Sequence, residues 1–276
     1  MSQELLKEFI ESIIRETREE DIANLRKANN SYIAVFKFLS DLGKNLKRFE
    51  AVFLKNNGWM ETLNISTTLS RNEHQDVEVS FRDRGFHSVS SKVNARAIRI
   101  KDQPDNPLDF KLKKFSIEIY FDAPPEAKKH PRTYNAWFAK NIEEIFSKPQ
   151  VRSSYIHEFT HVMDFKRMSP AYLQQRTNKK TKDLEKNLGK QRNFKAYAND
   201  PVELNAYFMQ ALFAAKANLK KAKTEEQKQD AIGKTPNEFA EKFIAVYLRP
   251  QIKKNLSPEN IQRLMKRAAT AWEHLK

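Results

Sequence analysis

The chain has 276 residues, enough for one large domain or two modest ones with a buried core. It has no cysteine, which excludes disulfide bridges, thiolate metal ligands and a cysteine nucleophile. The formal net charge of +15 favours acidic or phosphate-rich partners, although a basic surface can also serve solubility alone.

The first 57 residues are predicted to be helical. Apolar residues recur at helical spacing over residues 3–20 and again over residues 21–56, with a break near Gly43. The turn sequence Asn-Asn-Gly-Trp follows directly. We therefore predict an N-terminal helical region, 1–57, and one further domain over residues 58–276.

The N-terminus is charged throughout and lacks the uninterrupted apolar run of a signal peptide. No segment approaches the roughly 18 consecutive apolar residues of a membrane span. We therefore expect no membrane partner, and a cytoplasmic location or, if a phage encodes the chain, association with the virion.

Alternating apolar residues predict strands within residues 59–122. The segment 77–81 places three apolar side chains on one face, and residues 93–100 also favour a strand. The clearest strand covers residues 115–121, where four apolar side chains alternate with three polar or amphipathic ones. Together these segments predict a small, mostly antiparallel sheet.

Helical spacing returns after residue 130, beginning with a predicted helix at residues 134–147. Ser147 is the expected N-cap of the helix that follows. Further predicted helices cover residues 201–222, 236–248 and 258–275. The expected fold class is α+β, with a helix-rich core, a small sheet and N-terminal helices.

A candidate metal-binding motif lies at residues 155–164, Tyr-Ile-His-Glu-Phe-Thr-His-Val-Met-Asp. On a helix, His157 and His161 share one face, so both imidazoles can bind one ion. Zinc accepts such ligands and leaves one position to water in catalytic centres. Glu158 can then take a proton from water that the ion has acidified. An exposed helix with solvated histidines is the alternative, but Phe159 and other apolar neighbours predict burial.

The sequence His-Glu-Phe-Thr-His in a predicted helix, preceded by a strand, resembles the zincin metallopeptidases. In that family the preceding strand commonly binds extended substrate, which implies this role for residues 115–121. The metzincin extension, with a glycine and a third histidine, is missing after His161. Residues 197–208 instead resemble the Pro-x-Glu-x-x-Ala pattern of gluzincin-type proteins. This implies Glu203 as the third zinc ligand and Ala206 as the small residue where two helices approach.

Glu203 also has a purely structural interpretation. Asp200, Pro201 and Glu203 have the sequence of a helix cap, a first-turn proline and an acid that bonds back to the cap. The same pattern recurs at residues 235–238, where no metal role is expected. We favour the ligand role because zinc needs a third protein ligand, but the sequence alone leaves both interpretations open.

Two further residues have candidate roles around this motif. Asp164 could bind the ion directly, orient a neighbouring ligand, or be a surface aspartate. A peptidase also needs a hydrogen-bond donor for the oxyanion of the tetrahedral intermediate. Tyr197, shortly before the predicted ligand helix, is our choice. The other available donors are Tyr155, Tyr207, His87 and His130.

These patterns predict a zinc-dependent endopeptidase that hydrolyses protein or peptide substrates. His157, His161 and Glu203 would bind Zn²⁺, with Glu158 as general base. Residues 166–195 contain ten Lys or Arg and two acids, and could steer an acidic protein or a nucleic acid, form a lid, or be solvated surface. The alternative function is a basic nucleic-acid-associated or virion interaction protein with a structural or inactive zincin core.

Overall fold

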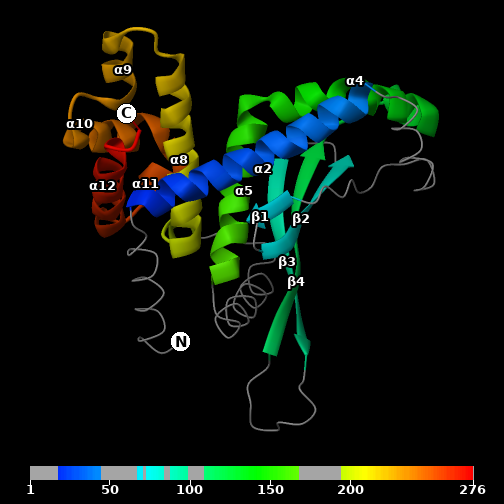
Figure 1. The fold of residues 1–276 in the computed structure, drawn as a ribbon, viewed down its shortest axis with the longest axis horizontal. Coiled ribbons are helices and arrows are strands. Elements are labelled where there is room, and N and C mark those ends of the chain that lie inside the picture. Colours follow the sequence, from blue (N-terminus) through cyan, green and yellow to red (C-terminus); the bar gives the residue numbers. More distant parts are fainter. Residues whose placement is uncertain are drawn as a thin grey trace. The chain divides into compact units, whose positions relative to one another are not determined.

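The computed structural model describes residues 18–44, 67–70, 73–83, 88–98, 109–167 and 194–275 (Figure 1). The chain divides into two compact units. Unit 1 comprises the described parts of Met1–Leu25, Ala97–Phe110 and Met163–Lys276, and unit 2 those of Arg26–Arg96 and Lys111–Val162. Helices α2 (Arg18–Lys44) and α5 (Pro149–Arg167) each run through a boundary between the units without a break. The predicted boundary after residue 57 lies outside the described residues and stays a prediction.

Four strands form one sheet in the order β1-β2-β4-β3. They are β1 (Thr67–Ser70), β2 (Glu73–Asp83), β3 (Ser88–Ile98) and β4 (Asp109–Phe121). β1 pairs with β2 in antiparallel orientation, but β2 and β4 are parallel. The prediction of a mostly antiparallel sheet is therefore not confirmed.

The predicted apolar faces of two strands lie side by side in this sheet. Val79 pairs with Ile117 and Phe81 with Ile119, so the alternating residues of β2 and β4 are in register. Phe81, Ile117 and Ile119 are fully buried. β4 is flanked by β2 and β3, so both of its hydrogen-bonding edges are taken. The expectation that residues 115–121 capture substrate as an edge strand is wrong.

Aromatic packing joins the helices of unit 2, which include α4 (Pro131–Ser147) after a short 3₁₀ turn, η1 (Ala127–Lys129). Tyr32 of α2 stacks on Phe146 of α4 at 4.6 Å between ring centroids, and its hydroxyl donates to the Phe146 carbonyl at 2.6 Å. Tyr155 of α5 packs edge-on against both rings. Ser147 belongs to the last turn of α4 and donates to the Glu144 carbonyl, so its prediction as the cap of α5 is wrong.

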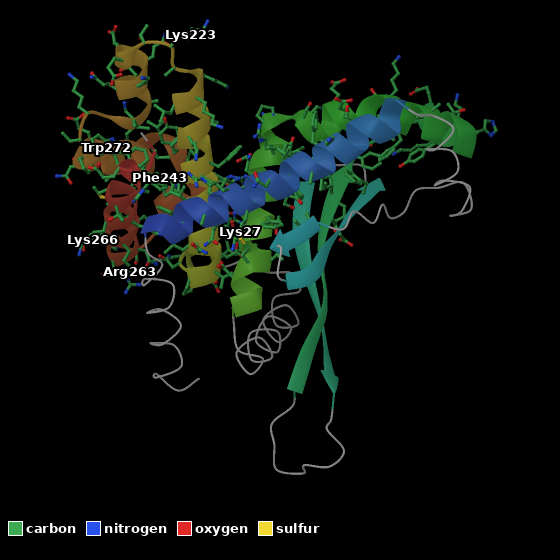
Figure 2. All side chains as sticks on the ribbon, viewed as in Figure 1. Lys27, Lys223, Phe243, Arg263, Lys266 and Trp272 are labelled. Carbon is green, nitrogen blue, oxygen red and sulfur yellow. The ribbon has the colours of Figure 1, made fainter. Side chains whose placement is uncertain are left out.

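Unit 1 is built mainly from short helices that follow α7 (Phe194–Ala198) and α8 (Pro201–Lys221). These are α9 (Glu225–Ile232), α10 (Pro236–Lys242), the π-helix η2 (Phe243–Tyr247), α11 (Pro250–Asn255) and α12 (Pro258–Trp272). Phe208, Phe239 and Phe243 form the centre of the core. Trp272, labelled in Figure 2, donates its indole N–H to the Ile232 carbonyl at 3.1 Å.

Prolines mark where most of these helices begin. Within the described residues, α4, α5, α8, α10, α11 and α12 each begin at a proline, whose fixed φ suits the first helical position. This explains why the predicted helices at 134–147, 201–222 and 258–275 are confirmed within a few residues. The predicted 236–248 helix is a short α-helix followed by a π-helical turn, and α7, α9 and α11 were missed. Residues 3–17 and 45–56 lie outside the described residues.

The part of the chain that the structure describes is helix-rich, as predicted. None of its helices combines the length and the apolar character needed to cross a membrane.

Candidate metal centre

The His-Glu-Phe-Thr-His sequence lies in the middle of α5, where the helix is buried on most of its surface. Ile156 and Phe159 are buried in the core. Tyr155 is also fully buried, and its hydroxyl forms a 2.8 Å hydrogen bond with Ser31 of α2. This packing fixes the rotation of α5, so that the two histidines of the motif point inward and not into solvent.

His157 and His161 converge through their Nε2 atoms, which lie 3.2 Å apart. Their ring planes are nearly perpendicular, at 87°, and each residue is only 6% exposed. Two nitrogens that bind one zinc ion at about 2.0–2.1 Å with a tetrahedral angle lie about 3.3 Å apart. The spacing of the two Nε2 atoms therefore fits a shared ion.

Glu203 joins the histidines from the first turn of α8. Ligand atoms of His157, His161 and Glu203 all lie within 4.8 Å of one another, and all three residues are buried. Two imidazoles and one carboxylate are a ligand set that zinc uses in hydrolases. The structure thus brings together the three residues predicted as ligands.

Comparison with α10 bears on the competing interpretation of Glu203 as a capping residue. Asp200 caps α8 by accepting hydrogen bonds from the Val202 and Glu203 backbone N–H groups, while its own N–H donates to the Tyr197 carbonyl. In α10 the equivalent Glu238 accepts a 2.8 Å hydrogen bond from the Lys234 backbone N–H. The same sequence pattern therefore places one glutamate at a backbone cap and the other in the metal-binding group.

Tyr197 lies next to the predicted ligand Glu203, within unit 1. Its hydroxyl is 3.3 Å from that of Tyr207, and the two rings meet edge to face. Burial, the nearby Glu203 carboxylate and hydrogen bonds to Tyr207 and Glu203 hold the pKa of Tyr197 far above its usual value. Tyr197 is therefore a protonated hydrogen-bond donor at any physiological pH.

Asp164 is buried, so its interpretation as a surface aspartate is wrong. Both of its carboxylate oxygens accept hydrogen bonds from Asn205 Nδ2 at 2.8 Å. Asp164 is not part of the group of three whose ligand atoms converge, and its role in orienting a ligand stays a prediction.

The other candidate residues divide between the site helix, the core and the surface. Glu158 follows His157 on α5 and is half-buried. Tyr155 belongs to the hydrophobic core described above, and His130 is exposed ahead of α4. His87 and most of residues 166–195 lie outside the described residues.

Asn205 is a site residue that the sequence analysis missed, and Tyr207 was given no specific position. Both follow Glu203 in the sequence Glu-Leu-Asn-Ala-Tyr at spacings of two and four. The available signal was a polar asparagine in an otherwise apolar helix, since a buried amide needs a hydrogen-bond partner. Asn199, before α8, also passed unnoticed: its side chain bonds the Asn255 carbonyl, the Ser257 N–H and the Asn260 amide.

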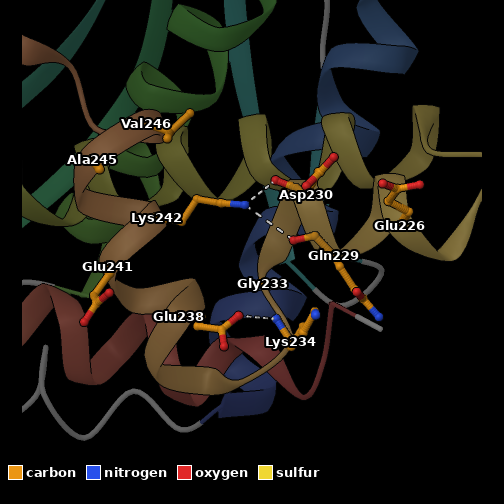
Figure 3. Close-up of a pocket in the computed structure, with 10 residues that line it drawn as sticks. All are labelled: Glu226, Gln229, Asp230, Gly233, Lys234, Glu238, Glu241, Lys242, Ala245 and Val246. Atoms are coloured by element: carbon orange, nitrogen blue, oxygen red, sulfur yellow. Dashed lines mark hydrogen bonds between the residues drawn. The ribbon is translucent and has the colours of Figure 1, made fainter.

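A surface hollow lies elsewhere in unit 1, formed by α9, α10 and η2 (Figure 3). Lys242 crosses it and donates to the Gln229 and Asp230 carbonyls at the end of α9. Gly233 follows with a φ of 74°, and a Cβ there would stand 2.8 Å from Glu238 Cβ. These contacts end α9 and begin α10. The hollow is therefore explained by the way these two helices are joined.

Comparisons with protein-family models, with curated proteins and with solved structures find no match. The candidate metal centre therefore stands on the residues and geometry of this chain.

Proposed function

We propose that the chain is a zinc-dependent endopeptidase of gluzincin type, with His157, His161 and Glu203 as the zinc ligands. The observation that carries this proposal is the buried group formed by these three residues, with Nε2 atoms 3.2 Å apart. A carboxylate and two imidazoles whose ligand atoms converge in this way are a set that one cation can bind together. The ligand types favour zinc among the common divalent ions.

Each residue of the site has a distinct chemical role in this proposal. A bound zinc ion supplies a Lewis acid that lowers the pKa of water and polarises a carbonyl oxygen. Glu158, next to the ligand pair and half-buried, takes the proton from the attacking water. The same carboxyl then delivers this proton to the amine that leaves, so one residue serves as base and acid.

Tyr197 is proposed to stabilise the oxyanion of the tetrahedral intermediate. Its hydroxyl stays protonated, for the reasons given above, and is placed beside Glu203 and Tyr207. When substrate binds, the Tyr197 O–H would turn from these partners to the oxyanion, and a donor in that position is worth roughly 10²- to 10³-fold in rate. The net charge of +15 supports an acidic protein or peptide as the substrate, because opposite charge raises the rate of encounter.

The test is replacement of Glu158 by Gln in the purified full-length protein. We expect the wild type to carry about one zinc per chain and to cut unstructured peptides at internal bonds, as read by mass spectrometry. Glu158→Gln should keep the zinc but lose hydrolysis by about 10²- to 10⁴-fold. Glu144→Gln, at an exposed position on α4, is the matched control and should retain full activity. Unchanged hydrolysis in Glu158→Gln would defeat the mechanism.

A second function, as a basic nucleic-acid-associated or virion interaction protein, is supported by the net charge. In that case the metal-binding group would have a structural role. The two functions differ in what Glu158→Gln does, because a structural centre does not need a general base.

A further inference from the structure

A buried hydrogen-bonded pair joins the two helices that carry the proposed zinc ligands. Asp164 lies on α5 and Asn205 on α8, and both belong to unit 1. The Asn205 Nδ2 group donates to both oxygens of the Asp164 carboxylate, each at 2.8 Å. Asp164 is 5% exposed and Asn205 3%, so solvent competes little for either partner. Hydrogen bonds to a charged group in such surroundings are short and strong.

The pair lies close in sequence to the proposed ligands on both helices. Asp164 follows His161 by three residues, nearly one helical turn, and Asn205 follows Glu203 by two. Slippage of either helix by one turn would move its side chains by about 5.4 Å, which exceeds the 4.8 Å span of the metal-binding group. The Asp164–Asn205 contact therefore opposes the displacement that would separate Glu203 from the histidines.

We propose that Asn205 is a positioning residue of the metal centre. By holding the Asp164 carboxylate, Asn205 fixes α8 against α5 and keeps Glu203 within reach of His157 and His161 before any ion arrives. This inference rests on the proposed zinc site and adds to it a reason why the three ligands come together. In this proposal Asn205 acts through Asp164 and is not itself a ligand.

The test compares zinc affinity in three variants of the full-length protein, measured by competition with a chromophoric chelator. Asn205→Leu removes the donor, and we expect zinc affinity to fall by about 10- to 100-fold, the usual effect of losing a group that orients metal ligands. The double exchange Asp164→Asn with Asn205→Asp rebuilds the same bond with donor and acceptor reversed, and should recover most of the affinity. Asn24→Leu is the control, since Asn24 is similarly buried in unit 1 but outside the pair.

The thermal midpoint of each metal-free variant separates positioning from general stability. A purely structural asparagine would lower the midpoint in Asn205→Leu while the folded variant bound zinc as tightly as the wild type, and this result would overturn the inference. An exchanged pair that folds but binds zinc no better than Asn205→Leu would overturn it as well. If the wild type itself binds no zinc, the proposed metal centre fails first. If Asn205→Leu does not fold, the zinc affinity of the exchanged pair relative to the wild type decides the question.

Discussion

At the scale of single residues, Glu203 and Glu238 show that the same cap-Pro-x-Glu pattern can place a glutamate in two different environments. Each is the third residue of a helix whose first residue is a proline that follows the N-cap residue. Glu238 is exposed and bonds a backbone N–H, whereas Glu203 is buried beside two imidazoles. The difference comes from what packs against each helix. Burial beside two histidines makes Glu203 a candidate metal ligand, whereas exposure leaves Glu238 to a backbone hydrogen bond.

This contrast predicts opposite outcomes for the same chemical change at the two positions. Glu203→Gln should lower zinc affinity by more than about 100-fold, since even residues outside a ligand set typically cost about 10- to 100-fold. Glu238→Gln should leave zinc affinity unchanged, because the amide oxygen can still accept the Lys234 hydrogen bond. Zinc content after dialysis and chelator competition measure both. Equal affinity in the two variants would show that Glu203 is not a ligand.

At the scale of elements, the sequence predicted the features that depend on the spacing of residues within one helix. The histidines converge because they lie four residues apart on one helix, and α8 begins where Asp200 and Pro201 predict it. Partners distant in sequence were not predictable in this way. Asn205 meets Asp164 across 41 positions, and β4 lies inside the sheet because of strand order, which alternation in one strand cannot reveal.

The packing of α2 against α4 depends on a tyrosine whose hydroxyl is buried. Burial raises the pKa of Tyr32 to about 12, and burial likewise raises the pKa of Tyr155 on α5. An unfolded tyrosine loses its proton near pH 10. Below pH 10 both states hold the proton, so the contribution of these groups to stability is fully present. Between pH 10 and 12 the unfolded state releases protons first, and stability falls.

We therefore expect the free energy of unfolding to decline from pH 10 upward, by up to about 1.4 kcal/mol per pH unit for each such tyrosine. Tyr32→Phe removes one of these titrations. The variant should be less stable at neutral pH, where it lacks the hydrogen bond to the Phe146 carbonyl, but its stability should decline less steeply above pH 10. Urea unfolding at several pH values gives both slopes, and lysine titrations cancel in the comparison. Parallel slopes would contradict the assignment.

At the scale of the whole molecule, a net charge of +15 is not needed to attract a neutral peptide substrate. Its basic residues include exposed positions on separate helices and loops, among them Lys27, Lys223, Arg263 and Lys266 (Figure 2). Charge distributed in this way acts through its summed field, which attracts any polyanion and is screened within about 8–10 Å at physiological salt. A field of this kind serves a nucleic-acid-binding function as readily as it serves attraction of acidic substrates.

Salt dependence separates these two uses of the charge. If the chain binds nucleic acid through phosphate contacts, the logarithm of its affinity for duplex DNA should fall linearly with the logarithm of salt concentration. Six to ten such contacts would weaken binding by about 10³- to 10⁵-fold between 50 and 200 mM salt. Fluorescence anisotropy with a labelled duplex measures this slope, with polyglutamate of matched charge as competitor. Absence of DNA binding at low salt would eliminate the nucleic-acid function, and stronger competition by polyglutamate than by DNA would favour acidic proteins as the partners.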